Sequence, residues 1–246
     1  MRRLLIRPGA IGDFIVSLPA LESLRADYTE VWCSRPNVPL AGFADSAQSI
    51  VSAGLDRLGL LPAEDVMARL ASFDSIISWY GANRPEFRQL VSHLPFQFLP
   101  ALPSGPGHAV EFYLNQARSL GAKPASRFPT IRCPETPRSF AVIQPFASSP
   151  AKRAPMEVFQ RISSRLAETM PVHWLAGPDE ELAGAVRMEN LYELACRLRQ
   201  ARIFVGNDSG ISHLAAAVGT PVLALFRASD PRLWAPRGPA VDIVSL

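Results

Sequence analysis

A polar turn near the end of the chain contains the residue types that bind phosphate. It lies between an apolar run at residues 203–205 and an alanine-rich segment at residues 211–218. This order predicts a strand, a tight turn and a helix, with Asp208 or Ser209 as the N-cap. Gly210 has no side chain, so a ligand can approach the backbone closely there.

The start of such a helix favours anions for two reasons. Its first backbone N–H groups have no acceptor within the helix, and the helix dipole adds partial positive charge at the same end. The turn therefore predicts a phosphate or diphosphate site. An ordinary capped helix in an α/β domain explains the same residues equally well.

A second loop, after the apolar run at residues 140–143, carries several hydrogen-bond donors. They are the hydroxyls of Ser148 and Ser149 and the cations of Lys152 and Arg153. Hydroxyl, ammonium and guanidinium groups together suit an anionic diphosphate. A solvated loop with incidental charge is the alternative.

A third loop and one histidine are weaker candidates. The acids at 179–181, Glu180 among them, follow a predicted strand. They suit ribose hydroxyls or a base, or the first turn of a helix. His213 is in a position to donate to a phosphate, although a lone histidine on an apolar helix is more often a packed residue. The other three histidines are scattered and indicate no metal cluster.

The first turn of the chain contains a carboxylate beside two glycines. Gly9, Gly12 and Asp13 follow an apolar run at residues 4–6, in a GxxG spacing that differs from the dinucleotide fingerprint GxGxxG. Asp13 is suited to take a proton from a substrate hydroxyl. A helix N-cap is the other interpretation of Asp13 and the more common role.

The hydrophobic pattern predicts two α/β halves. We expect strands at residues 4–6, 29–33, 49–51, 74–79, 140–143, 172–176, 203–205 and 222–226. We expect helices at residues 14–25 (kinked or delayed by Pro19), 110–120, 156–169, 191–200 and 211–218. Alternating strands and helices indicate parallel sheets, and residues 123–138 are a proline-rich linker candidate. The expected domains are 1–122 and 139–246, two Rossmann-like units facing a cleft.

Composition excludes several classes of function. The net charge of the 246 residues is +3, and no basic run with interleaved aromatics suggests nucleic-acid binding. The three cysteines are far apart, as expected of thiols in a reducing compartment. No run resembles a signal peptide or a membrane span. We expect a cytoplasmic protein, and its mildly basic charge allows an anionic membrane surface as a partner.

Two motifs taken together resemble a known family. Arg-Pro-Gly-Ala-Ile-Gly-Asp at 7–13 precedes Leu-Pro-Ala-Leu at 18–21, and Gly-Asn-Asp-Ser-Gly-Ile-Ser-His-Leu-Ala-Ala-Ala at 206–217 precedes Gly-Thr-Pro at 219–221. In this order they resemble the heptosyltransferases of lipopolysaccharide core synthesis, glycosyltransferase family 9. The resemblance extends over nearly the whole chain.

The resemblance implies a GT-B fold and an inverting sugar transfer. It implies an ADP-heptose donor, a lipopolysaccharide-core or related glycan or glycolipid acceptor, and no metal ion or further cofactor. It makes Asp13 the general base on the acceptor hydroxyl. It also implies a binding site for the donor. The candidate donor-binding residues are Ser148, Lys152, Arg153, Glu180, Asp208, Ser209, Gly210 and His213.

Other functions remain open at this stage. One is a nucleotide-sugar-binding relative without catalysis, and another is a Rossmann-type oxidoreductase or epimerase, which the missing GxGxxG disfavours. Acceptor contacts are expected from N-terminal loops such as residues 80–88. Arg84 and Arg88 lie there, and a solvated helix face explains them as well.

Overall fold

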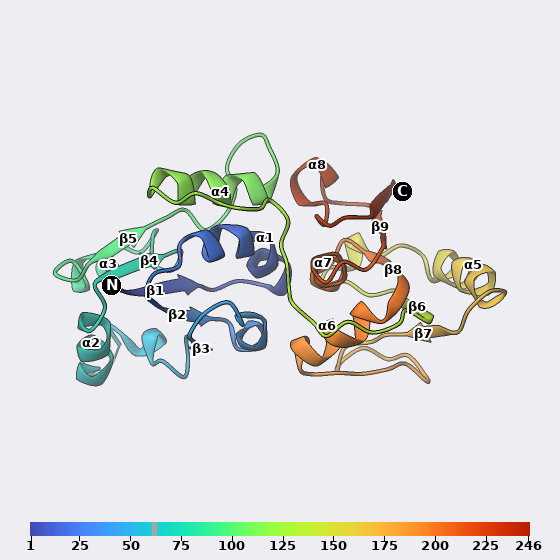
Figure 1. The fold of residues 1–246 in the computed structure, drawn as a ribbon, viewed down its shortest axis with the longest axis horizontal. Helices are drawn as coiled ribbons and strands as arrows, with labels where there is room; N and C mark the ends of the chain where they lie inside the picture. The colour runs from blue at the N-terminus through green and yellow to red at the C-terminus, as the bar shows by residue number, and fades with distance from the viewer. Residues whose placement is uncertain (61–62) are drawn as a thin grey trace.

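The computed structural model describes residues 1–60 and 63–246 and shows two α/β halves side by side (Figure 1). In the described residues each half holds one five-stranded parallel sheet. The first has the order β3-β2-β1-β4-β5 and the second β10-β9-β8-β6-β7. The first-sheet strands are β1 (Arg2–Arg7), β2 (Tyr28–Cys33), β3 (Ser46–Ser49), β4 (Ser75–Ser78) and β5 (Phe96–Phe98). The second-sheet strands are β6 (Phe140–Gln144), β7 (Val172–Trp174), β8 (Ala201–Asn207), β9 (Val222–Phe226) and β10 (Val241–Ser245). The α/β class predicted from the sequence is confirmed.

Helices cover both sheets. The first half contains α1 (Ile11–Ser23), α2 (Glu64–Ala71), α3 (Pro85–Leu90) and α4 (Ala109–Ser119). The second contains α5 (Met156–Ala167), α6 (Leu191–Arg199), α7 (Gly210–Ala217) and α8 (Pro231–Trp234). Short 3₁₀ turns are η1 (Arg35–Leu40), η2 (Leu55–Arg57) and η3 (Pro150–Lys152).

The central strand β1 is apolar on both faces because helices pack on both. Leu5 joins a core cluster with α1 and α4, while Leu4 and Ile6 join a second cluster with α2 and α3. All three side chains are fully buried. Alternation of side chains along a strand accounts for this division.

One hydrophobic cluster extends through both halves. Helix α1 contributes Phe14 and Leu18, and helix α7 contributes Leu214 and Ala217 to the same cluster. The two helices lie where the halves meet (Figure 1). The N-terminus of α1 is therefore held directly against the second half.

Helix α1 begins earlier than the sequence suggested. Its first turn closes with the bond from Phe14 N–H to the Ala10 carbonyl, 3.0 Å, so the helix begins at Ile11 and not at Phe14. It continues through Pro19 to Ser23. Ala10 is the N-cap residue. The interpretation of Asp13 as an N-cap is therefore wrong, since Asp13 lies inside the first turn.

Two other differences concern short elements. The strand expected at residues 49–51 is Ser46–Ser49, because the chain turns at residues 50–54, where Gly54 has φ +73°. Strand β5 has only three residues, which is too short for an alternating hydrophobic pattern to predict it. The acids at 179–181 precede no helix, so their interpretation as first-turn charges is wrong.

The chain passes between the halves in an extended segment from α4 to β6 (Figure 1). It contains no helix or strand between Leu120 and Ser139. Ile131 N–H donates to the carbonyl of Ala217 at 2.9 Å, which ties this segment to the end of α7. The exact domain bounds stay a prediction.

Candidate functional site

The end of β8 is joined to the second-domain loop by one buried amide. Asn207 is fully buried; its Oδ1 accepts from Ala154 N–H at 2.8 Å, and its Nδ2 donates to the carbonyl of Pro145 at 2.8 Å. Both ends of the loop that carries Lys152 are thereby fixed to the strand that leads into α7. The loop and the helix start are one rigid unit because a buried amide with both partners satisfied is costly to disturb.

Lys152 and Asp208 form an ion pair at the start of α7. The ammonium lies 2.6 Å from Asp208 Oδ2. Only 5% of the Asp208 side chain is exposed, against 33% for Lys152. Ser229 donates its hydroxyl to the same carboxylate oxygen. A buried carboxylate is tolerated only when it is paired, and here an ammonium and a hydroxyl satisfy it.

Ser209, and not Asp208, is the N-cap of α7. Its Oγ accepts from Ser212 N–H at 3.4 Å and donates to Gln144 Oε1 at 3.3 Å. Within the described chain the N–H groups of Gly210 and Ile211 have no acceptor. They are the first two of the helix and lie next to the ion-paired Asp208. The helix start therefore presents free donors, as an anion site requires.

Gly210 is needed by the packing of the two halves. A Cβ added there would lie 2.7 Å from the Cβ of Ile11 and 3.1 Å from the backbone nitrogen of Gly12. The absence of a side chain at Gly210 thus lets the starts of α1 and α7 come this close. The anion-binding end of α7 and the turn of α1 that carries Asp13 are brought together by this contact.

His213 is a packed residue. Its side chain is buried, and a Cβ added at Gly12 would lie 3.2 Å from its Cδ2. Burial lowers the pKa of His213 to about 4, although the nearby Asp208 carboxylate opposes the shift. The imidazole is neutral near pH 7 and contributes no cation to a phosphate.

The two other donors of the loop differ in their surroundings. Ser148 is exposed. Arg153 is held in place: its Nε donates to the carbonyl of Ala147 at 2.9 Å, and its guanidinium lies 5.6 Å from the centre of the Phe146 ring. Arg227 donates to the carbonyl of Arg153 at 2.8 Å. The loop therefore lies beside the segment that follows β9.

A buried arginine supports the turn that carries Asp13. Arg7 Nη2 donates to the carbonyl of Asp13 at 3.0 Å and to the Tyr113 hydroxyl at 2.8 Å, and Nη1 donates to the carbonyl of Pro8 at 2.8 Å. Burial lowers the pKa of Arg7 and raises that of Tyr113 to about 12. Gly9 has φ +127°, and a Cβ there would come within 3.5 Å of Asp13 Oδ2. Arg7 thus fixes the backbone of the turn from which the Asp13 carboxylate extends.

Glu180 is occupied within its own loop. Its Oε2 accepts from Gly177 N–H at 2.6 Å, while Arg187 donates to its backbone carbonyl at 2.7 Å. A nucleoside hydroxyl that binds this carboxylate must share or replace the contact with Gly177.

The arginines suggested for an acceptor are exposed on or beside α3. Arg84 donates to the Tyr80 hydroxyl at 2.7 Å, and the guanidinium of Arg88 lies 5.3 Å from the centre of the Phe98 ring. Both belong to the first half and are separate from the Lys152 cluster.

Several residues of this site were not found from the sequence. Asn207, Gln144, Ser229 and Arg7 act through partners far along the chain, such as the 62-residue separation between Asn207 and Pro145. Their one local signal is position, since each lies at or just after the end of a strand, where ligands bind in open α/β sheets. In the described residues no group of three or more His, Cys, Asp or Glu side chains could hold a metal ion.

Two Rossmann-like halves that meet at their helix starts define the GT-B class of fold. Three solved structures of this fold are similar to the chain. Over 99% of this chain and 90% of the other, it matches the E. coli ADP-heptose LPS heptosyltransferase II with a TM-score of 0.75 and 18% identity. It matches E. coli heptosyltransferase WaaC with ADP (TM-score 0.72, 19% identity, 100% and 93% coverage) and a glycosyl transferase family 9 protein from Veillonella parvula (0.74, 17%, 100% and 86%).

The sequence places the chain within a family. The model of glycosyltransferase family 9 (heptosyltransferase) matches residues 106–246, more than half of the chain. The chain belongs to this family. It is also 42% identical over 59 residues to lipopolysaccharide heptosyltransferase 3 of Escherichia coli, and 38% identical over 73 residues to that of strain K12. These matches span 24% and 30% of this chain but only 16% and 18% of the relatives' length. No helix in the described residues has the length and apolar character to cross a membrane.

Proposed function

We propose that this protein is an inverting glycosyltransferase that moves heptose from ADP-heptose to a lipopolysaccharide-core or related glycan acceptor. Family membership and the names of the similar heptosyltransferases support the class of reaction. The similar structure that holds ADP supports the choice of nucleotide. A glycan or glycolipid acceptor accords with peripheral association with the inner membrane, which is part of the proposal.

The observation that carries the proposal is the Lys152–Asp208 pair at the start of α7, beside the turn with Asp13. A nucleotide-sugar donor leaves a diphosphate when its sugar is transferred, and negative charge develops on the leaving oxygen. The ammonium of Lys152 and the free N–H groups of Gly210 and Ile211 are preorganised donors for that charge. Ser148 and Arg153 add donors from the same loop.

The proposed reaction is a single displacement. Asp13 takes the proton of the acceptor hydroxyl, and the hydroxyl oxygen forms a bond to the anomeric carbon. The bond from that carbon to the diphosphate oxygen breaks, and ADP leaves with the electron pair. Attack opposite the leaving group inverts the configuration. The proposal routes no step through a metal ion or further cofactor, because protein donors balance the charge.

The remaining candidates have supporting roles in this proposal. Glu180 meets the nucleoside after exchanging its contact with Gly177. Asp208 and Ser209 fix Lys152 and the helix start. His213 acts by packing against Gly12, because it is buried and neutral.

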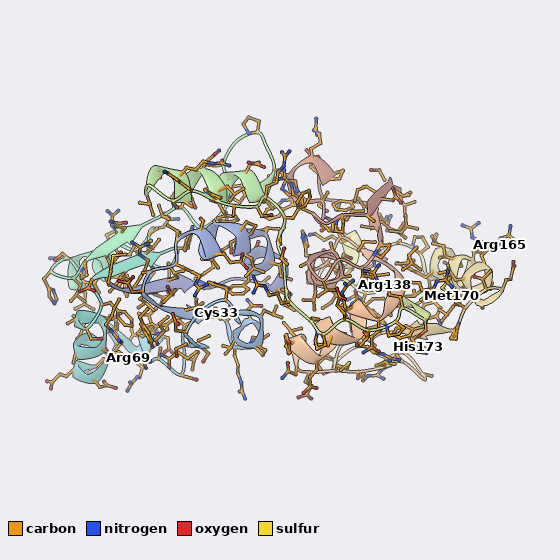
Figure 2. All side chains as sticks on the ribbon, in the orientation of Figure 1. Cys33, Arg69, Arg138, Arg165, Met170 and His173 are labelled. Carbon is orange, nitrogen blue, oxygen red and sulfur yellow. The ribbon has the colours of Figure 1, made fainter. Side chains whose placement is uncertain are left out.

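Calorimetry of the purified protein with ADP, UDP, GDP and NAD tests the donor site. We expect selective binding of ADP and a loss of at least about tenfold in Lys152→Ala, because the charged hydrogen bonds that it removes contribute about 1.5–3 kcal/mol. Arg165→Ala is the matched control. Arg165 is 82% exposed and projects from α5 at the outer end of the second half (Figure 2). Absence of nucleotide binding in the wild type would refute the proposed donor site.

Transfer assays with Asp13→Asn test the catalytic role. Loss of a general base lowers the rate by about 10²–10⁴-fold. We expect that loss of rate in Asp13→Asn, with the affinity for ADP retained. Asp56→Asn is the control, because Asp56 is exposed on η2, and it should keep full activity. Full activity of Asp13→Asn would refute the role of Asp13. Tight ADP binding without transfer to any acceptor would favour the non-catalytic relative instead.

A further inference from the structure

A cavity of about 980 Å³ lies apart from the candidate site. Its walls are the second part of α1, residues 39–45, residues 123–132 of the interdomain segment, and Tyr192 of α6. Both halves and the segment between them therefore contribute to it. Cavities of roughly 300–1,000 Å³ are typical of small-molecule sites.

The cavity is distinct from the site around Asp13. Glu22, on its wall, follows Asp13 by nine residues in α1, which corresponds to about 14 Å along the helix axis. None of the donor-site candidates lines the cavity. A ligand bound here leaves Lys152 and Asp13 free.

The charges around the cavity favour an anionic group. Within residues 1–60 and 63–246, the side chains of Arg25, Lys123 and Arg132 make no ion pair or hydrogen bond, and all three line the cavity. Of the two carboxylates on its wall, Asp45 is already bonded to Thr29 N–H at 2.8 Å. All three cations are exposed, and one free carboxylate opposes them within the cavity. Guanidinium groups with open donors match phosphate geometry.

The free carboxylate is Glu22. Glu22 is exposed at the surface; partial desolvation raises its pKa, and the charges of Arg132 and Arg25 oppose that shift. It therefore lies in the electrostatic field of both guanidiniums without a direct bond to either. A carboxyl group in this position accepts hydrogen bonds from hydroxyl groups of a ligand.

The remaining walls suit a sugar ring. The hydroxyls of Ser126 and Thr130 add small donors and acceptors, while Phe43 and Tyr192 add aromatic surface. Tyr192 is 38% exposed. Hydroxyls and aromatic faces in the same cavity as Arg25 and Arg132 match a ligand that carries both alcohol groups and a phosphate.

We propose that this cavity binds a phosphorylated saccharide. Its phosphate lies against Arg25 and Arg132, its hydroxyls against Glu22, and its ring against Tyr192. Because Tyr192 belongs to the second half and Arg25 to the first, the bound ligand bridges them. The proposal does not depend on the reaction proposed above.

Binding experiments with the full chain test this proposal. Calorimetry and NMR titration measure the affinity for glucose 1-phosphate, glucose and inorganic phosphate. We expect saturable binding of glucose 1-phosphate that is tighter than that of phosphate or glucose alone. Arg25→Ala/Arg132→Ala should weaken it by about tenfold or more, because charged hydrogen bonds are lost. Glu22→Gln should weaken the binding of glucose 1-phosphate more than the binding of inorganic phosphate.

Two controls locate the ligand. Arg127→Ala removes an exposed cation of the same interdomain segment that does not line this cavity, so binding should be unchanged. Lys152→Ala is the second control, because Lys152 belongs to the other site and its loss weakens only ligand that is bound there. Loss of binding in Lys152→Ala with retention in the double variant would overturn the proposal, as would the absence of saturable binding. Equal affinity for phosphate and glucose 1-phosphate would overturn the saccharide assignment.

Discussion

Removing the ammonium of Lys152 should destabilise the fold as well as weaken nucleotide binding. Lys152→Met keeps the length of the side chain but leaves the Asp208 carboxylate, 5% exposed, with Ser229 as its one side-chain partner among the described residues. Leaving one charge of a buried pair without its partner costs about 3–5 kcal/mol. Since a third of Lys152 is exposed, water can enter in its place, and we expect a lower cost of about 2–3 kcal/mol.

Thermal unfolding followed by circular dichroism measures this cost. For a chain of this size, 1 kcal/mol corresponds to about 2–4 °C in Tm, so Lys152→Met should melt about 4–12 °C lower. Lys152→Met/Asp208→Asn should regain most of that loss, because it leaves no buried charge unpaired. The double variant should still bind ADP weakly, since the ammonium is absent. Stability and binding are thereby separated.

A surface pair supplies the comparison. Arg165 Nη1 lies 3.4 Å from Glu168 Oε1, and the two side chains are 82% and 61% exposed. Arg165→Met should therefore change the free energy of unfolding by less than about 1 kcal/mol. An unchanged Tm in Lys152→Met would refute the reasoning, because it would mean that Asp208 needs no cation. A double variant no more stable than the single one would refute it too, since unpaired charge would not be the cause.

Three further predictions concern Gly210, His213 and Cys33. Gly210→Ala should lower stability by about 1–3 kcal/mol in thermal melts, because its Cβ would lie 2.7 Å from Ile11 Cβ, whereas Gly42→Ala, with nothing within 4 Å, should have little effect. Burial lowers the pKa of His213 from 6.5 to about 4, so the unfolded chain binds a proton at this residue more tightly than the folded chain does. The contribution of His213 to stability should therefore be full above pH 6.5 and fall as the pH drops toward 4. Thermal melts of His213→Gln should lose that dependence on pH. Cys33 is fully buried and its pKa is raised to about 12, so iodoacetamide should label it only after unfolding, as read by mass spectrometry; labelling in the native state would contradict its burial.

Sequence patterns were sufficient where an element is long or its ends carry local signals. Helix α4 was expected at residues 110–120 and lies at Ala109–Ser119, where His108 caps its start and Gly121, with φ +85°, follows its end. Helix α6 was likewise placed to within one residue at its end. A period of 3.6 over several turns is a strong signal, and it needs no knowledge of distant residues.

The site was predictable only in part for the same reason. Lys152 and Asp208 were each singled out on local grounds, but their contact spans 56 residues and no local pattern encodes it. Ser229 lies three residues beyond β9 and has no motif that marks it as a partner of Asp208. The predicted start of α1 was three residues too late because its N-cap is Ala10, whose side chain cannot accept a hydrogen bond and so gives no capping signal in the sequence.

The cluster that joins α1 to α7 has a consequence during synthesis. Helix α7 is synthesised about 200 residues after α1. At a synthesis rate of about 5–20 residues per second, the apolar face of α1 is therefore without α7 for about 10–40 s. During that time the surface formed by Phe14, Leu18 and their neighbours is only partly covered by α4. A nascent chain paused before α7 should therefore expose a hydrophobic surface that a holdase chaperone can bind. The N-terminal half produced alone should aggregate more readily than the full chain.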